Sequence, residues 1–437
     1  MSRPLAVICL AAGLGKRTKV STPKVLLPLC GRTLAATALA AVAPLQPDRT
    51  IVVLHHQKDA VQKSLQAAVG DSLRGLSFVD QGAPKGTGHA VQVAMQALAD
   101  FRGDVLVIYG DCPLIETETL AALRELRGDA TPCTVLTAYP EDPTGLGRIL
   151  RDDDGRFVGI REERDCDDEE RAIDEINAGF YCFDSEALRG ALAGLQPNNA
   201  QGEYYLTDAV AAFAAAGREV PTLEIDDPSE IQGVNSLVDL ALARQVMQER
   251  ILLEHLQNGV LIVDPATTWI DHGVRIGRDT KILPCTVIGA GCVIGEGCEV
   301  GPFAHLRAGT VLEGGAEVGN FVEAKKTTLG PGAKAKHLTY LGDATIGARA
   351  NIGAGTITAN YDGVHKHPTT IGERVFVGSG TVIVAPSELG DHSMTGAGAI
   401  VTRGSKVGAG EVWVGVPARK LKQRDLPTGG APAKEKA

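Results

Sequence analysis

Hydrophobic and polar positions follow different periods in the two halves of this chain. Up to about residue 227, apolar runs of strand length alternate with longer segments of helical spacing. The runs at 5–10, 50–56, 75–80 and 104–110 predict buried strands, and the segments at 34–43, 58–69 and 88–101 predict helices. Such alternation indicates a mostly parallel α/β sheet, whose ligands bind at the carboxyl ends of the strands.

From residue 276 onward, aliphatic side chains recur at every sixth position. The series runs through Ile276, Ile282, Ile288, Ile294, Val300, Leu306, Leu312 and Val318. A period of six fits neither a helix nor an alternating strand, and it predicts a prism of short parallel strands, the hexapeptide β-helix. The phase slips at Leu329 and again at Ile346, and residues 359–370 interrupt the count, so we expect a loop to leave the coil there.

A polar hinge and a helix separate the two patterns. Residues 226–235 are polar, and residues 237–259 have the length and apolar spacing of one helix that ends at Gly259. At 1.5 Å per residue, roughly 22 residues would form a rod of about 33 Å between two domains. We expect a first domain at 1–235, a linker helix at 236–259, a β-helix domain at 260–425 and a disordered tail at 426–437.

Composition narrows the class of protein. A chain of 437 residues with 44% hydrophobic and 22% charged residues suits a two- or three-domain protein with a real core. The net charge of -10 argues against nucleic acid or an anionic membrane as the main partner. The nine cysteines include no C-x-x-C pair, which favours reduced, buried thiols over disulfides or zinc. Since no apolar segment reaches the ~18 residues of a membrane span, we expect a cytoplasmic protein.

The loop after the first apolar run combines glycines with cations. In "AAGLGKRTKVSTPK", Gly13 and Gly15 would let backbone N–H groups approach phosphate oxygens, while Arg17 and Lys24 neutralise charge. The spacing matches neither the Gly-x-Gly-x-x-Gly dinucleotide motif nor a P-loop. We favour phosphate binding over a merely basic loop.

Asp111 follows the fourth predicted strand, in "YGDCPL". It could cap the next turn, but it also lies where the ligand of the sheet is expected. A carboxylate beside a triphosphate is a ligand that magnesium prefers, so we favour the metal interpretation.

Polar residues gather in the second half where the repeat slips, among them Lys325, His337 and Tyr340. Insertions and irregularities of a solenoid are where binding surfaces are usually built. Taken alone, His337 is as easily a surface histidine as a catalytic base. His365 and His367 alternate on the expected loop but lack a third ligand, which disfavours a metal site there.

Together these motifs resemble the bacterial family of bifunctional N-acetylglucosamine-1-phosphate uridyltransferases / glucosamine-1-phosphate N-acetyltransferases, the GlmU family. In the first domain the resemblance is carried by "LAAGLGKR", "GTGHA", "DPTGLGRI", "EINAGFY", "NNAQGEYYLTD" and "GVNS". In the second it is carried by "GPFAHLRAGT", "VGNFVEAKK", "KHLTYLGDATIG", "NIGAGTITANYDG" and "VFVGSGTVIVAP". It implies a Rossmann-like nucleotidyltransferase domain, a linking helix and a left-handed parallel β-helix that assembles as a homotrimer, with the acetyl site shared between subunits.

The resemblance implies two reactions of UDP-N-acetylglucosamine synthesis for the cell wall. Acetyl-CoA acetylates glucosamine-1-phosphate, and N-acetylglucosamine-1-phosphate then takes UMP from UTP with release of pyrophosphate and a requirement for Mg²⁺. For UTP and the sugar nucleotide it implies binding by Leu10, Ala11, Ala12, Gly13, Gln81, Gly86, Thr87, Tyr109, Gly110, Gly147, Glu162 and Asn177. Arg17 and Lys24 would meet the phosphates, and Asp111 and Asn235 would ligate the metal.

For acetyl transfer, the resemblance implies that His337 is the base that deprotonates the sugar amine. The groups that would grip glucosamine-1-phosphate are Arg307, Lys325, Tyr340, Asn351 and Lys366. The positions that would contact acetyl-CoA are Ala354, Asn360, Tyr361, Ser379 and Ala397. Two alternatives remain: a single-activity sugar nucleotidyltransferase with a structural β-helix, and a non-catalytic regulatory subunit. The intact His337, Asn360 and Tyr361 count against the first, and the retained Arg17, Lys24 and Asp111 count against the second.

Overall fold

The computed structural model describes residues 3–13 and 15–423, apart from the side chain of Lys16. The chain divides into two compact units, residues 1–247 and 248–437. The division falls inside helix α8 (Leu237–Gln257), which occupies the span expected for the linker helix. The tail expected to be disordered, 426–437, lies outside the described residues. Within the described part of the chain, no helix is long and apolar enough to cross a membrane.

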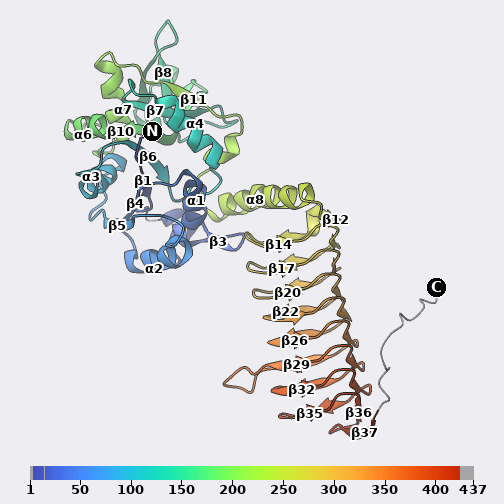
Figure 1. Ribbon diagram of the computed structural model, residues 1–437. Coiled ribbons are helices and arrows are strands. Elements are labelled where there is room, and N and C mark those ends of the chain that lie inside the picture. Colours follow the sequence, from blue (N-terminus) through green and yellow to red (C-terminus); the bar gives the residue numbers. More distant parts are fainter. Residues whose placement is uncertain (1–2, 14, 424–437) are drawn as a thin grey trace. The chain divides into compact units, whose positions relative to one another are not determined.

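The first unit is built on a mixed sheet with helices on both faces (Figure 1). Its strands are β1 (Leu5–Leu10), β4 (Arg49–Leu54), β5 (Leu76–Asp80), β6 (Asp104–Tyr109), β7 (Cys133–Ala138), β8 (Arg148–Arg151), β9 (Phe157–Arg161), β10 (Ile176–Asp184) and β11 (Thr222–Glu224). The order is β11-β7-β10-β6-β1-β4-β5, with β8 and β9 attached beside β10. The four strands expected from apolar runs are the parallel β1, β4, β5 and β6, whereas β10 runs antiparallel to β6 and β7.

Two apolar layers bind the helices to this sheet. On one face lie α1 (Leu34–Val42), α2 (Lys58–Val69) and α4 (Thr117–Arg127), and on the other lie α3 (Thr87–Ala97), α6 (Ser185–Ala193) and α7 (Leu206–Ala215). Successive residues of β1 alternate between them, since Val7 joins the first layer and Ile8 the second. A strand buried on both faces needs apolar residues throughout, which explains the unbroken run that predicted it.

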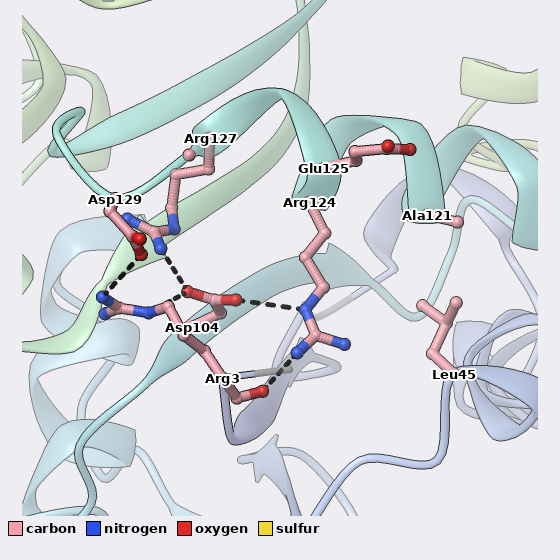
Figure 2. A pocket seen from close by; sticks show the side chains of 9 residues that line it. Arg3, Leu45, Asp104, Ala121, Arg124, Glu125, Arg127 and Asp129 are labelled. Carbon is pink, nitrogen blue, oxygen red and sulfur yellow. Dashed lines mark hydrogen bonds and ion pairs between the residues drawn. The ribbon is translucent and has the colours of Figure 1, made fainter. Parts of the chain in front are cut away.

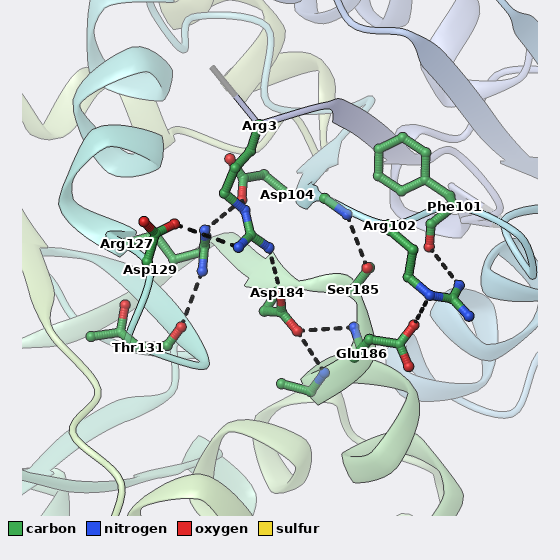
Figure 3. Close-up of polar contacts among 12 residues, drawn as sticks. Arg3, Phe101, Arg102, Asp104, Arg127, Asp129, Thr131, Asp184, Ser185 and Glu186 are labelled. Atoms are coloured by element: carbon green, nitrogen blue, oxygen red, sulfur yellow. Dashed lines mark hydrogen bonds and ion pairs between the residues drawn. The ribbon is translucent and has the colours of Figure 1, made fainter. Parts of the chain in front are cut away.

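An ion-pair network closes the amino end of the sheet, opposite the carboxyl ends of its parallel strands. Asp104, at the start of β6, accepts from Arg3 Nε (3.1 Å), Arg124 Nε (3.1 Å) and Arg127 Nη2 (2.7 Å). These arginines line a pocket of about 380 Å³ (Figure 2), and Arg3 Nη2 also lies 2.5 Å from Asp184 Oδ2 (Figure 3). Both oxygens of Asp104 are engaged and Arg127 is buried, so the network ties the N-terminal segment to the sheet.

The second unit is a left-handed parallel β-helix of very short strands stacked in three sheets (Figure 1). The first sheet contains β12 (Leu261–Ile262), β15 (Lys281–Ile282), β18 (Glu299–Val300), β21 (Glu317–Asn320), β24 (Lys334–His337), β27 (Asn351–Ile352), β30 (Phe376–Val377), β33 (Met394–Thr395), β36 (Glu411–Val414) and β37 (Arg419–Gln423). The second contains β13 (Trp269–Ile270), β16 (Val287–Ile288), β19 (His305–Leu306), β22 (Glu323–Lys325), β25 (Tyr340–Gly342), β28 (Ile357–Ala359), β31 (Val382–Val384) and β34 (Ile400–Val401). The third contains β14 (Arg275–Ile276), β17 (Val293–Ile294), β20 (Val311–Leu312), β23 (Thr328–Leu329), β26 (Ala344–Ile346), β29 (Thr369–Ile371), β32 (Ser387–Leu389) and β35 (Lys406–Val407).

The six-residue period places one aliphatic side chain of each strand in the interior. Ile282, Ile288 and Val300 are fully buried, and each pairs in register with the next coil. The small residues between them are buried as well. Thr280 and Thr286 satisfy their hydroxyls by donating to the carbonyls of Gly295 and Leu283, both at 2.7 Å. The interior therefore excludes water without leaving these two hydroxyl groups unpaired.

The slips in the repeat are shortened corners of successive coils. Lys281, Glu299 and Glu317 pair at a regular spacing, but Glu317 pairs with Lys334, one residue sooner. The residue is lost between the second and third sheets, in the turn from β22 to β23 and again from β25 to β26. In the next coil the same corner carries the loop between β28 and β29. The irregular positions expected from the sequence therefore lie along one edge of the β-helix.

Candidate functional sites

A cavity of about 1070 Å³ opens in the first unit at the carboxyl ends of its strands. Residues after β6, around the start of β10 and at the start of α8 line it. The sequence-predicted residues in its lining are Arg17, Thr87, Tyr109, Asp111, Gly147, Glu162, Asn177 and Asn235. The sheet therefore brings together residues from loops far apart in the sequence, as expected for ligand binding at strand ends.

The other predicted residues of this site lie at the same edge without lining the cavity. They are Leu10, Ala11, Ala12, Gly13, Lys24, Gln81, Gly86 and Gly110. Backbone hydrogen bonds fix two of their loops to the end of β4, from Ala11 N to Val53 O (3.0 Å) and from Gln81 N to Leu54 O (2.8 Å). Gly110 N donates to Leu10 O at 2.9 Å, which joins the loop after β6 to β1.

The predicted metal ligands converge on one cation, the ammonium of Lys24. Its Nζ is bonded to Asp111 Oδ2 and lies 3.1 Å from Asn235 Oδ1. Lys24 is only 8% exposed. A backbone bond from Val234 N to Asp111 O (2.8 Å) brings the two segments together. Gly15 is required beside them, because its φ is +60° and a Cβ there would lie 2.9 Å from Lys24 Cβ.

This donor set fits magnesium. A carboxylate and an amide oxygen are hard ligands, and here they already surround a positive charge. Two protein oxygens leave coordination positions for water and phosphate, which is how Mg²⁺ is usually held. Among the described residues, no cluster of three or more His, Cys, Asp or Glu side chains forms a self-contained metal site.

The opposite wall of the cavity presents fixed polar groups. Thr207 Oγ1 donates to Glu162 Oε1 at 3.1 Å, and burial raises the pKa of the Glu162 carboxyl. Asn177 donates from Nδ2 to the Tyr181 hydroxyl (2.7 Å) and accepts from Gly179 N at Oδ1 (3.1 Å). Burial also raises the pKa of Tyr109, so this phenol is neutral. Oriented donors and acceptors of this kind suit sugar hydroxyl groups.

Sequence reasoning missed several lining residues of this cavity. Tyr139, Glu141 and Asp142 come from the loop after β7, and Asp239 comes from the first turn of α8. The Pro- and Gly-rich "DPTGLG" was a signal for the loop, since such turns join strands at binding edges. Asp239 gave no such signal, because an acidic residue in a first helical turn is ordinary.

Predicted residues of the second site form a column down one corner of the β-helix. The backbone of each coil donates to the coil before it, from Gly355 N to His337 O (3.4 Å), from Gly380 N to Ala354 O (2.7 Å) and from Gly398 N to Ser379 O (2.8 Å). His337, Ala354, Ser379 and Ala397 are thus stacked, one per coil, between the first and second sheets. The three residues that follow His337 in this column, Ala354, Ser379 and Ala397, have small side chains.

His337 ends β24 and is oriented by the coil above it. Its Nδ1 lies 2.9 Å from Asn320 Oδ1, its register partner on β21. An amide oxygen can only accept, so Nδ1–H donates this bond, and in the neutral ring the lone pair then lies on Nε2. His337 is solvent-exposed within one chain. Asn320 was not among the predicted site residues, and nothing in its spacing distinguished it from other corner residues.

A cationic cluster lies at the other corner of the second sheet. Lys325 follows Arg307 by one coil, and Lys366 from the loop is close enough to lower the pKa of the Lys325 ammonium, with Arg307 adding to this effect. Glu323 partly offsets the charge by accepting from Arg307 Nη1 at 2.7 Å. Such crowding of Lys325 by other cations forms a site that an anion such as a phosphate would stabilise.

Tyr340 lies on the sheet between this cluster and His337, which it follows by three residues. Other predicted residues are not gathered with them in a single chain. Asn351 pairs with Lys334 on the first sheet. Asn360 and Tyr361 lie on the loop, where Asn360 Nδ2 donates to Asp343 Oδ2 and Tyr361 is 59% exposed.

An exposed apolar ridge lies directly beside the proposed base. Phe303, Phe321 and Leu338 occupy the corner in successive coils and are 51%, 55% and 63% exposed. The two phenyl rings stack with centroids 5.2 Å apart. All three adopt left-handed backbone conformations, with φ of 54°, 55° and 47°, which cost about 1–2 kcal/mol each for non-glycine residues.

Comparisons with known proteins cover both units. Residues 7–209 match the MobA-like NTP transferase domain, and residues 273–308 and 368–403 match the bacterial transferase hexapeptide family. The chain is 43% identical to the bifunctional protein GlmU of Thermobifida fusca, over 100% of this chain and 97% of that one. It is 41% identical to the proteins of the same name from Corynebacterium aurimucosum, over 91% and 88% of the two chains, and Synechococcus sp., over 93% and 96%.

Proposed function

The chain belongs to the bifunctional GlmU family, and from this premise we propose how its two sites divide the two reactions of the enzyme. It is a two-domain transferase that acetylates glucosamine-1-phosphate and couples the product to UMP. We assign uridyl transfer to the cavity of the first unit and acetyl transfer to the β-helix. The convergence of Lys24, Asp111 and Asn235 carries the first assignment, and the column below His337 carries the second.

In the uridyl transfer site, positioning and charge neutralisation do the chemical work. The phosphate of N-acetylglucosamine-1-phosphate attacks the α-phosphorus of UTP in line, and pyrophosphate leaves, so no protein nucleophile is needed. Asp111 and Asn235 would hold Mg²⁺, which supplies charge stabilisation on the phosphates when bound. Arg17 and Lys24 bring positive charge to the same oxygens, while Glu162 and Asn177 orient the sugar.

The predicted residues that lie outside the cavity lining define the nucleotide end of this site. Leu10 ends β1 and Ala11, Ala12 and Gly13 follow it, while Gln81 and Gly86 precede α3. Thr87, the first residue of α3, lines the cavity beside them. Both loops are bonded to the end of β4, so they form one edge on which the uracil would rest. Tyr109, Gly110 and Gly147 then complete the path toward the sugar.

In the acetyl transfer site, His337 Nε2 removes a proton from the C2 amine as nitrogen attacks the thioester carbonyl of acetyl-CoA. The C–S bond then breaks, and CoA leaves as the thiol after its sulfur takes that proton back from the imidazolium. The Nδ1–H bond to Asn320 holds the ring in the tautomer that a base needs. Arg307, Lys325 and Lys366 bind the sugar phosphate, with Tyr340 and Asn351 on the sugar. Ala354, Ser379 and Ala397 form the corner along which the pantetheine arm lies, and Asn360 and Tyr361 contact acetyl-CoA from the loop.

We further propose that three copies assemble through their β-helices in the cytoplasm. Phe303, Phe321 and Leu338 expose a strained apolar ridge that only another surface would cover. Because the ridge adjoins Asn320 and His337, a neighbouring copy packed there would enclose the base. It would also supply the predicted residues that a single chain leaves apart, such as Asn351.

Two single substitutions in the full chain test the division of labour. CoA release from acetyl-CoA and glucosamine-1-phosphate reports one reaction, and pyrophosphate release from UTP, N-acetylglucosamine-1-phosphate and Mg²⁺ reports the other. We expect His337→Ala to abolish the first and Asp111→Ala to abolish the second, with the untouched reaction as each variant's control. Normal acetylation by His337→Ala would show that the base is misassigned and would favour a structural β-helix.

A further inference from the structure

The first turn of α8 reaches back to the residue that precedes the helix. Asp239 Oδ2 accepts from Ser236 N and from Asn235 N, both at 2.8 Å. Ser236 Oγ in turn accepts from Asp239 N at 3.2 Å. The bonds between Ser236 and Asp239 form a reciprocal helix cap. The bond to Asn235 lies outside that cap, since Asn235 is one residue farther from the helix.

Asn235 is consequently fixed on both sides. The preceding peptide is held by the bond from Val234 N to Asp111 O (2.8 Å), and its own N–H is held by Asp239. Between these two anchors its side chain places Oδ1 3.1 Å from Lys24 Nζ. Asp239 also lines the cavity. Its carboxylate thus acts on the position of Asn235 from within the site.

We propose that Asp239 is a positioning residue for uridyl transfer, which holds Asn235 in the orientation that binds the divalent cation. This inference rests on the proposed function, because it takes Asn235 to be a metal ligand. Asp239 itself need not touch the metal. Groups that orient a ligand typically change metal affinity by 10- to 100-fold when removed.

A purely structural role for Asp239 makes a different prediction. A helix cap stabilises the fold and would be weakened equally by removing either partner, Ser236 or Asp239. Of these two residues, Asp239 is the one whose side chain hydrogen-bonds to Asn235, whereas the Ser236 hydroxyl accepts from Asp239 N. Ser236→Ala therefore serves as a matched control, because it deletes the cap hydroxyl while leaving the carboxylate bond to Asn235.

The test measures Mn²⁺ binding to the full-length, nucleotide-free protein by electron paramagnetic resonance. We expect Asp239→Ala to weaken Mn²⁺ binding about 10- to 100-fold. We expect Ser236→Ala to bind Mn²⁺ as the unaltered chain does, and Asp239→Asn, which keeps an oxygen acceptor, to lose only a few-fold. In assays, Asp239→Ala should raise the Mg²⁺ concentration for half-maximal uridyl transfer while acetyl transfer stays unchanged, which also reports that the chain has folded.

The outcomes separate this inference from the proposed function. Asn235→Ala should lose Mn²⁺ binding, and if it does not, the proposed metal ligands are wrong. If Asn235→Ala loses binding but Asp239→Ala does not, the positioning role is wrong and the metal ligands stand. Equal losses in Ser236→Ala and Asp239→Ala would also overturn the positioning role, because capping alone would then explain both.

Discussion

The hydrogen bond between Asn320 and His337 makes the sharpest prediction about acetyl transfer. Asn320→Ala removes the acceptor that holds His337 Nδ1–H at 2.9 Å and frees the ring to adopt the tautomer that presents N–H to the substrate. A hydrogen bond of this kind contributes about 0.5–1.5 kcal/mol. If the whole free energy of this hydrogen bond stabilises the transition state, its loss lowers the rate of acetyl transfer about 2- to 12-fold.

The assay follows CoA thiol release at saturating acetyl-CoA and glucosamine-1-phosphate. Asn320→Asp is the matched variant, because a carboxylate still accepts from Nδ1–H, and it should retain most of the activity that Asn320→Ala loses. The loss should fall on kcat rather than on KM for the sugar, since Asn320 contacts His337, the proposed base. Uridyl transfer by the same preparation controls for folding. Full activity in Asn320→Ala, or an equal loss in both variants, would refute the reasoning.

Three further predictions follow from the interior, the charge clusters and the loop. Ile288→Ala should lower the unfolding free energy of the β-helix by about 2–5 kcal/mol, because Ile288 is fully buried. Val287→Ala on the same strand should change that free energy little, because Val287 is 40% exposed. Denaturant unfolding followed by the fluorescence of Trp269 and Trp413, which lie in this unit, measures the stability of each variant. Although burial alone would raise it, hydrogen bonds from Ala187 N and Arg3 lower the pKa of Asp184 below 3.8. Its stabilisation is present above that pH and lost as pH falls, so Asp184→Asn should be less stable at pH 6 but lose less stability on acidification, as thermal unfolding at pH 6 and pH 3.5 can show. Lys366→Met should raise KM for glucosamine-1-phosphate about tenfold with little change in kcat, because it removes one of the three cations proposed to bind the phosphate. An unchanged KM would place the phosphate elsewhere.

The β-helix could be predicted from sequence because its period has no competing explanation. Each interior position must be aliphatic or small, so Ile282, Ile288 and the later buried residues recur visibly at every sixth position of the sequence. The parallel strands of the first unit could also be predicted from the sequence, since burial on both faces requires an unbroken apolar run. The antiparallel direction of β10 could not be predicted, because it depends on how the preceding loops bring the chain back to the sheet.

The sites were predictable only as far as chemistry is visible in residue type. Lys24 and Asp111 stood beside a glycine loop and a strand end, which suggested phosphate and metal before any fold was known. Asn320 and Asp239 act through neighbours that the fold supplies, Asn320 across coils and Asp239 back across a helix start. No local pattern marks such residues, because their significance arises from register and capping geometry.

The stacking of His337, Ala354, Ser379 and Ala397, one per coil, gives the proposed acetyl-CoA site a length that is fixed by the number of coils. Adjacent coils are separated by the spacing of paired strands, about 4.8 Å, so three steps measure about 14 Å along the axis. If the pantetheine arm of acetyl-CoA lies along this column, the number of coils it crosses sets the distance between its thioester and its nucleotide end. Adding or removing coils would therefore change the length of this site only in steps of about 4.8 Å.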